Sequence, residues 1–166
     1  MRFLVNASAT IALCLAGTAP VAAELDDGPQ LIDTIVLWLA VNFDLPAPAD
    51  VPALASLSHA ELVAMRYGPE ATVAPGEVVA VYDDVAATIY LNEEWTGRTP
   101  AELSVLVHEM VHHMQSTAGM RFACPGEREA LAYRAQEAWL GRFGESLEST
   151  FGIDAATLLV GTVCTH

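Results

Sequence analysis

Apolar residues recur at helical spacing in several segments of the chain. In a helix, positions three and four apart share a face, so this spacing predicts helices that bury one side. The first of these segments, residues 31–43, is apolar around most of its circumference and is too short to span a bilayer. Ser58, Thr99 and Asp154 are suitable N-caps for three of the helices. The helices are expected over residues 31–43, 59–66, 100–117, 127–143 and 154–160.

Two other segments have the composition of β-strands. Residues 78–82 and 87–91 are rich in β-branched and aromatic side chains, and Asp83-Asp84-Val85 between them predicts a hairpin. Residues 51–57 are ambiguous, because Pro52 limits this segment to an edge strand at best. The pattern therefore predicts an α+β fold with a small antiparallel or mixed sheet.

The helix over residues 100–117 contains the pattern His-Glu-x-x-His. His108 and His112 are four residues apart, so a helix places both imidazoles on one face, one turn apart. Glu109 lies about 100° around the helix from His108 and can reach a water on a metal without being a ligand. The pattern fixes only three of five positions, so a chance match is the alternative.

The sequence around this pattern favours a metal site. Thr99 and Glu102 form a capping box around Pro100, so the pattern falls in the middle of a helix. The apolar residues of this helix predict that it is buried. Buried histidine and glutamate side chains need partners, because an unpaired buried polar group is costly. A metal ion would supply that partner.

A catalytic zinc ion usually has three protein ligands and an open position for water. The next long helix offers Glu127, Glu129 and Glu137 as the third ligand. Glu127 and Glu129 lie about 200° apart around the helix, so both cannot face one ion. Glu129 shares a largely apolar stripe with Ala132, Tyr133, Gln136, Leu140 and Phe143, and is therefore the better candidate. The alternative for Glu129 is an ion pair with an arginine.

Residues 1–23 have the features of a secretory signal peptide. Arg2 supplies the positive end, a short apolar stretch follows, and Val21-Ala22-Ala23 is a small-residue cleavage site. Residues 24–166 are then expected to form a single domain of an exported protein, either periplasmic or extracellular. Cys14 leaves with the signal, and Cys124 and Cys164 remain. In an oxidising compartment the even pair predicts a disulfide, with two free buried thiols as the alternative.

The formal net charge of the chain is −14, and the sequence contains no lysine. An acidic surface of this kind is repelled by nucleic acid and by anionic lipid. Neither nucleic acid nor a membrane is therefore an expected partner. A solvated acidic surface on an exported protein explains the charge without any specific cationic partner.

In these two helices the chain resembles the gluzincin metallopeptidases. His108-Glu109-Met110-Val111-His112, followed on a later helix by Glu129-Ala130-Leu131-Ala132-Tyr133, is similar to their motif. The resemblance covers residues 58–143 and implies a zincin-like domain with zinc held by His108, His112 and Glu129. Many members have an aspartate where this chain has Tyr133, and that aspartate orients a ligand histidine. The resemblance also implies that a strand around residues 89–91 holds an extended substrate.

The function implied by the resemblance is hydrolysis of a peptide or protein substrate. Glu109 would act as the general base towards a zinc-activated water. Tyr133, Tyr90 and His166 are candidates for stabilising the oxyanion, whereas His113 should face away from the metal. One alternative is a non-catalytic zincin-like module that binds a protein partner. Another is a latent enzyme whose helix over residues 31–43 covers the cleft.

Overall fold

A computed structural model gives the structure of the protein and describes residues 28–74 and 76–164. The predicted signal peptide and His166 lie outside these residues. The described part is an α+β fold with six helices and a three-stranded sheet. The elements are α1 (Gly28–Phe43), β1 (Ala53–Leu57), α2 (His59–Tyr67), β2 (Ala80–Asp83), β3 (Thr88–Asn92), α3 (Pro100–Thr117), α4 (Pro125–Gly141), α5 (Leu147–Phe151) and α6 (Ala155–Thr162).

The sheet is mixed and has the order β1-β3-β2. β2 and β3 form the predicted antiparallel hairpin, and β1 pairs with β3 in parallel. The segment that the sequence left ambiguous thus forms an edge strand, β1, which begins directly after Pro52. The expectation that residues 89–91 hold a substrate is wrong, because β3 is central and both of its edges are already paired. β2 and β1 are the two edge strands.

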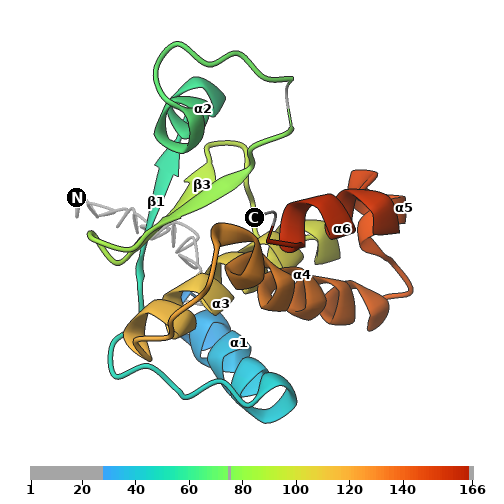
Figure 1. Cartoon of the computed structure of the whole chain (residues 1–166). Coiled ribbons are helices and arrows are strands. Elements are labelled where there is room, and N and C mark those ends of the chain that lie inside the picture. The colour runs from blue at the N-terminus through green and yellow to red at the C-terminus, as the bar shows by residue number, and fades with distance from the viewer. Residues whose placement is uncertain (1–27, 75, 165–166) are drawn as a thin grey trace, which may run out of the picture.

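The sheet lies between α2 on one face and α3 on the other (Figure 1). Side-chain alternation along β3 explains these two layers. Ile89 and Leu91 enter the main core with α3, whereas Tyr90 packs on the smaller cluster under α2. The main core joins α1, β3, α3 and α4, and its fully buried side chains include Ile35, Leu39, Ile89, Leu106, Met110 and Met114.

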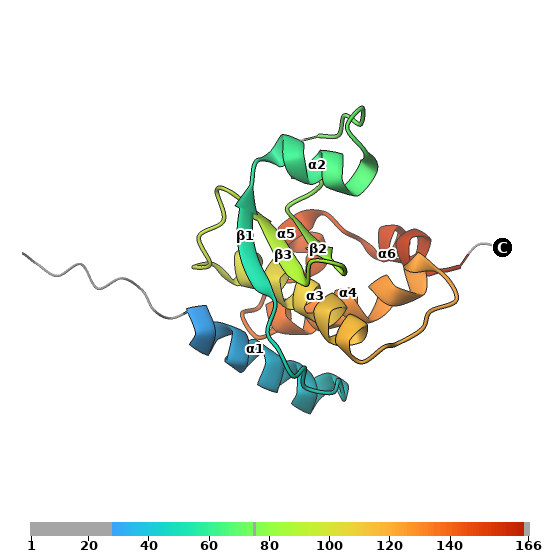
Figure 2. The ribbon, with the colours of Figure 1, turned by 90° about the vertical axis from the view of Figure 1, so that its left-hand side faces the viewer.

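α1 lies on the side of the molecule away from α2 (Figure 2). Its side chains Ile32, Ile35 and Leu39 are buried in the main core. Trp38 packs edge-on against Trp139 of α4, with ring centroids 5.2 Å apart. This helix therefore completes the core behind α3. That position contradicts the interpretation of α1 as a segment covering the cleft.

The C-terminal helix α6 packs against α4. Cys124 and Cys164 form the predicted disulfide, with their Cα atoms 5.7 Å apart. A Cβ on Gly126 would lie 3.0 Å from the carbonyl oxygen of Gly161, so glycine permits this close approach. The short helix α5 was not predicted, although Ser146 and Ser149 form a capping box at its start. No helix within residues 28–74 and 76–164 is long and apolar enough to cross a membrane.

Candidate metal centre

The start of α3 is fixed by the predicted capping box. Thr99 Oγ accepts a hydrogen bond from the Glu102 N–H at 3.1 Å, and the Glu102 carboxylate accepts one from the Thr99 N–H at 3.0 Å. Partial burial raises the pKa of Glu102, but hydrogen bonds from Thr96, Arg98 and Thr99 outweigh it and lower the pKa to about 2. An ionised Glu102 thus holds the helix start two turns before the motif.

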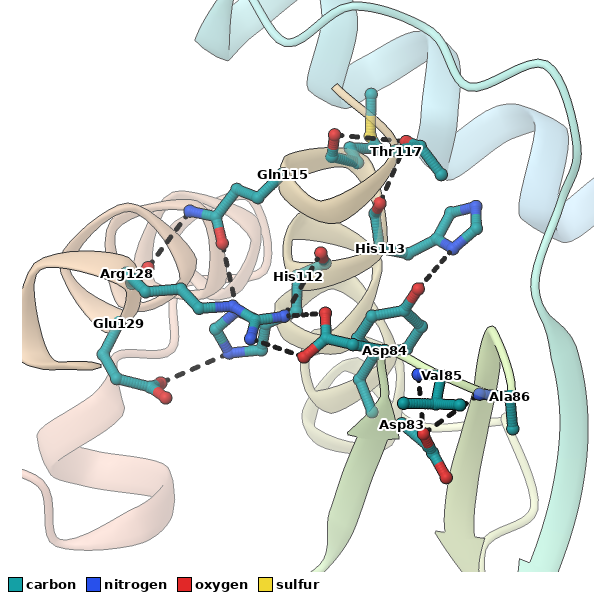
Figure 3. Close-up of polar contacts among 12 residues, drawn as sticks. Asp83, Asp84, Val85, Ala86, His112, His113, Gln115, Thr117, Arg128 and Glu129 are labelled. Carbon is teal, nitrogen blue, oxygen red and sulfur yellow. Dashed lines mark hydrogen bonds and ion pairs between the residues drawn. The ribbon is translucent and has the colours of Figure 1, made fainter. Parts of the chain in front are cut away.

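His108, His112 and Glu129 meet at one point. The two Nε2 atoms are 3.2 Å apart, and Glu129 Oε2 lies 3.1 Å from His108 Nε2 and 3.3 Å from His112 Nε2. Figure 3 shows Glu129 extending from α4 towards the His112 ring. One nitrogen from each histidine and one carboxylate oxygen therefore form a group that could hold a metal ion.

The other glutamates of α4 have different partners. Glu127 accepts a hydrogen bond from the Ala123 N–H at the start of the helix. Glu137 accepts one from the Leu147 N–H at 2.7 Å and so ties α4 to α5. Among the described residues, the structure thus brings Glu129 to the histidines and assigns Glu127 and Glu137 to local contacts.

Two glutamine side chains orient the imidazoles. Gln136 Oε1 lies 3.0 Å from His108 Nδ1, and Gln115 Oε1 lies 3.1 Å from His112 Nδ1. The amide nitrogen of Gln136 donates to Ser104 Oγ, and that of Gln115 donates to the Arg128 carbonyl oxygen. Because both amide nitrogens have acceptors, each amide oxygen faces an imidazole N–H. Nδ1 then carries the proton in both histidines, which leaves Nε2 for a metal.

Spacing in the sequence contained a signal for these glutamines. Gln115 follows His112 by three residues, and Gln136 follows Glu129 by seven, which is two helical turns. Each therefore shares a helix face with a ligand. Gln136, and not the residue at position 133, is thus the hydrogen-bond partner that orients His108.

Charges in the group interact strongly. Burial alone would raise the pKa of the Glu129 carboxyl, but the adjacent His108 and His112 imidazoles lower it well below its usual range. Burial would lower the pKa of His112, and the adjacent Glu129 raises it above its ordinary value. Glu129 is therefore ionised, and its negative charge is directed at the two Nε2 atoms.

The family described as Domain of unknown function (DUF6647) matches residues 24–165. The chain belongs to this family. No curated protein and no solved structure matches the chain. The family description names no reaction and no ligand, so the function is inferred from the side chains at the site.

Glu109 is buried and lies outside the three-ligand group. Its negative charge contributes to the pKa shifts of both His112 and Tyr133. The Tyr133 ring packs edge-on against His108, with centroids 4.8 Å apart. Burial and the charge of Glu129 raise the pKa of Tyr133, so its hydroxyl stays protonated at neutral pH and can donate a hydrogen bond. Glu109 and Tyr133 thus neighbour the same histidine pair.

Two other residues considered in the sequence, His113 and Tyr90, lie away from the ligand group. His113 points away from the ligands, as expected, and its ring nitrogens contact Tyr82 Oη at 3.1 Å and the Asp50 carbonyl oxygen at 2.8 Å (Figure 3). Tyr90 is wrong as an oxyanion candidate, because it packs in the cluster under α2. His113 therefore fixes α3 against β2 and the segment before β1.

A cavity of about 360 Å³ lies along the N-terminal half of α3. Val105, one turn before Glu109, forms part of its wall. The lining combines apolar side chains with four polar ones, which are His59, Asn92, Glu94 and Glu102. The apolar lining comes from Val78, Val79, Trp95, Ala101, Val105 and Phe151. The cavity therefore lies between the start of α2, the segment before β2 and the first turns of α3, and its lining includes none of the three ligand candidates.

Proposed function

We propose that this protein is an exported zinc metallopeptidase with a zincin-like domain. The observation that carries the proposal is the meeting of His108, His112 and Glu129 within a few ångströms of one another. Glu109 lies on the same helix, next to the first of these ligands. The proposed substrate is a peptide or a protein.

The donor set fits zinc. Two imidazole nitrogens and one carboxylate oxygen are a common ligand set of catalytic zinc sites, which keep a further position open. Gln115 and Gln136 accept the Nδ1 protons, as second-layer partners of zinc-bound histidines usually do. The Glu129 side chain is about one quarter exposed, so the group is accessible from solvent. These three observations support a catalytic site over a closed structural one.

The residues around the group support hydrolysis of an amide bond. Zinc, when bound there, would acidify a water and polarise the scissile carbonyl. Glu109 accepts a proton from the attacking water and then delivers it to the leaving nitrogen. The C–N bond breaks, the oxygen of water joins the acyl carbon, and the products are a carboxylate and an amine. The Tyr133 hydroxyl is the proposed donor to the oxyanion.

Glu109 distinguishes this proposal from the non-catalytic alternative. A structural zinc site needs ligands and partners for its histidines, but it does not need a free carboxylate beside them. Glu109 is buried near Tyr133 and His112, close enough to the ligand candidates to reach a water bound beside them. Its presence favours catalysis over a module that only binds a protein partner.

The disulfide and the predicted signal peptide together support export. Disulfides form and persist mainly in oxidising compartments. The Cys124–Cys164 bridge joins α4, which carries Glu129, to the C-terminal segment. The periplasm and the extracellular medium both fit this proposal.

The test combines zinc content with peptide hydrolysis. Purified protein should bind one zinc ion per chain and hydrolyse members of an unbiased peptide library. Zinc removal should abolish hydrolysis, and adding zinc back should restore it. A protein that binds zinc but cleaves no peptide would be a binding module instead.

A further inference from the structure

The start of α4 carries a metal-ligand candidate but little buried surface. Glu129 lies in the second turn of this helix, whereas its first buried side chain is that of Ala132. Before Ala132, the partly buried Leu131 packs on the main core. The N-cap residue, Cys124, makes no side-chain hydrogen bond to the helix. Helix ends with few buried apolar contacts open locally at low free energy, so apolar packing does little to fix Glu129.

An ion pair joins this part of α4 to the β2–β3 turn. Arg128, the residue before Glu129, donates from Nη1 and Nη2 to the two carboxylate oxygens of Asp84, each at 2.7 Å. Paired bonds of this kind fix the relative orientation of the two groups. Hydrogen bonds from Arg128 also lower the pKa of Asp84, so its carboxylate is ionised at neutral pH. Figure 3 shows Arg128 reaching from α4 across α3 at His112 to Asp84.

The β2–β3 turn has a fixed shape and a fixed place on α3. The Asp83 carboxylate accepts hydrogen bonds from the N–H groups of Val85 at 2.8 Å and Ala86 at 3.0 Å. One position earlier, Tyr82 Oη lies 3.1 Å from His113 Nδ1. The turn is therefore held by its own side chain, and its strand is attached to the helix that carries both histidine ligands.

The main chain of Arg128 takes part in orienting a second ligand. Its carbonyl oxygen accepts a hydrogen bond from Gln115 Nε2 at 3.1 Å, and Gln115 Oε1 lies 3.1 Å from His112 Nδ1. The Arg128 carbonyl thus determines which end of the Gln115 amide faces the imidazole. A displacement of Arg128 would move Glu129 and turn this amide together. Arg128 is therefore coupled to two of the three ligand candidates.

We propose that Asp84 is a positioning residue of the metal centre and acts through Arg128 on Glu129 and Gln115. This inference rests on the metal site of the proposed function, but not on the reaction. Asp84 itself lies outside the ligand group. The side chains of Arg128 and Asp84 are 27% and 45% exposed, and an ion pair this accessible adds little to global stability. Loss of the pair should therefore change zinc binding much more than unfolding.

Matched variants of the full chain test this inference through their affinity for zinc. Asp84→Asn keeps the size of the side chain but loses its charge and one of its two acceptors, so zinc affinity should fall about tenfold. Asp84→Glu keeps the carboxylate and should restore most of the affinity. Asp33→Asn, at an exposed position of α1, is the control and should bind zinc as wild type does. Competition with a chromophoric chelator measures the affinities, and urea unfolding without metal measures stability.

Double variants distinguish positioning through Gln115 from a general loosening of the fold. The loss of zinc affinity in Asp84→Asn/Gln115→Leu should be about threefold or more smaller than the product of the two single losses, because both changes act on His112. Gln136→Leu acts on His108 instead. Its loss should multiply with that of Asp84→Asn to within about twofold.

Three results would overturn this inference. The first is zinc binding by Asp84→Asn that is as tight as in wild type, which would leave the metal site itself intact. The second is loss of the folded state in Asp84→Asn, because the pair would then hold the fold and not the site. The third is a wild-type protein that binds no zinc, which would overturn the proposed function as well.

Discussion

Gln136 Oε1 accepts a hydrogen bond from His108 Nδ1 across the α3–α4 interface, at 3.0 Å. This contact fixes the tautomer and the direction of a proposed zinc ligand. Gln136→Leu should therefore weaken zinc binding about 10–100-fold. Gln136→Glu keeps an acceptor for Nδ1–H and should restore most of the affinity. Competition with a chromophoric chelator measures both variants. Gln30→Leu, at an exposed position of α1, is the matched control and should bind zinc as wild type does.

Glu129 and Glu127 differ in role although they are two residues apart. Glu129→Ala removes one of the three atoms that converge on the metal position, so zinc affinity should fall by at least about 100-fold. Glu127→Ala removes only a contact to the Ala123 N–H and should barely change the affinity. Isothermal titration calorimetry of the two variants decides between them. Equal losses of affinity would mean that α4 does not present Glu129 to the metal.

Glu102 should make the stability of the protein depend on pH. Its pKa in the folded protein is about 2 against an ordinary value of 4.5. The ionised form therefore stabilises the fold fully above about pH 4.5, and this contribution is lost as the pH falls through 2. Glu102→Gln should cost about 1–2 kcal/mol at pH 7 and progressively less in acid.

Urea unfolding of wild type and Glu102→Gln at several pH values measures this dependence. Glu70→Gln, in an exposed turn, is the control and should show little effect at any pH. A difference between Glu102→Gln and wild type that stays constant from pH 7 to pH 3 would show that the capping carboxylate does not titrate as described.

The disulfide should contribute strongly to stability. Cys124 and Cys164 are separated by 40 residues, and closing a loop of this length is worth about 4 kcal/mol in the chain-entropy model. The double variant Cys124→Ser/Cys164→Ser should lose up to that amount, because no side chain of α6 is buried to hold the helix in place. Denaturant unfolding of oxidised wild type and the double variant gives the difference. Identical midpoints would show that the packing of α6 on α4 is sufficient without the bridge.

The sequence predicted the elements whose causes are local. Capping boxes at Ser58 and Thr99, helical periodicity, and the Asp83-Asp84-Val85 turn each depend on a few neighbouring residues. The choice of Glu129 over Glu127 also followed from the geometry of one helix. This choice agrees with the structure because Glu127 lies on another face of the same helix.

Features that depend on the docking of distant elements could not be predicted. The central position of β3 depends on parallel pairing with β1, which is 35 positions away at Ala53↔Thr88. The orienting role of Gln136 depends on the rotation of α4 against α3, which helical spacing alone does not give. The five residues of α5 are too few for periodicity to be recognised. The packing of α1 behind α3 likewise follows from the core as a whole.

Hydrolysis of a peptide library by zinc-loaded wild type and by zinc-loaded Glu109→Gln decides whether Glu109 acts as a general base. Glutamine keeps the shape of the side chain but cannot accept a proton from water. We expect equal zinc content in both proteins and a rate lower by about 10²–10⁴-fold in the variant. Equal hydrolysis rates at equal zinc content would contradict the proposed role of Glu109 and the metallopeptidase mechanism with it.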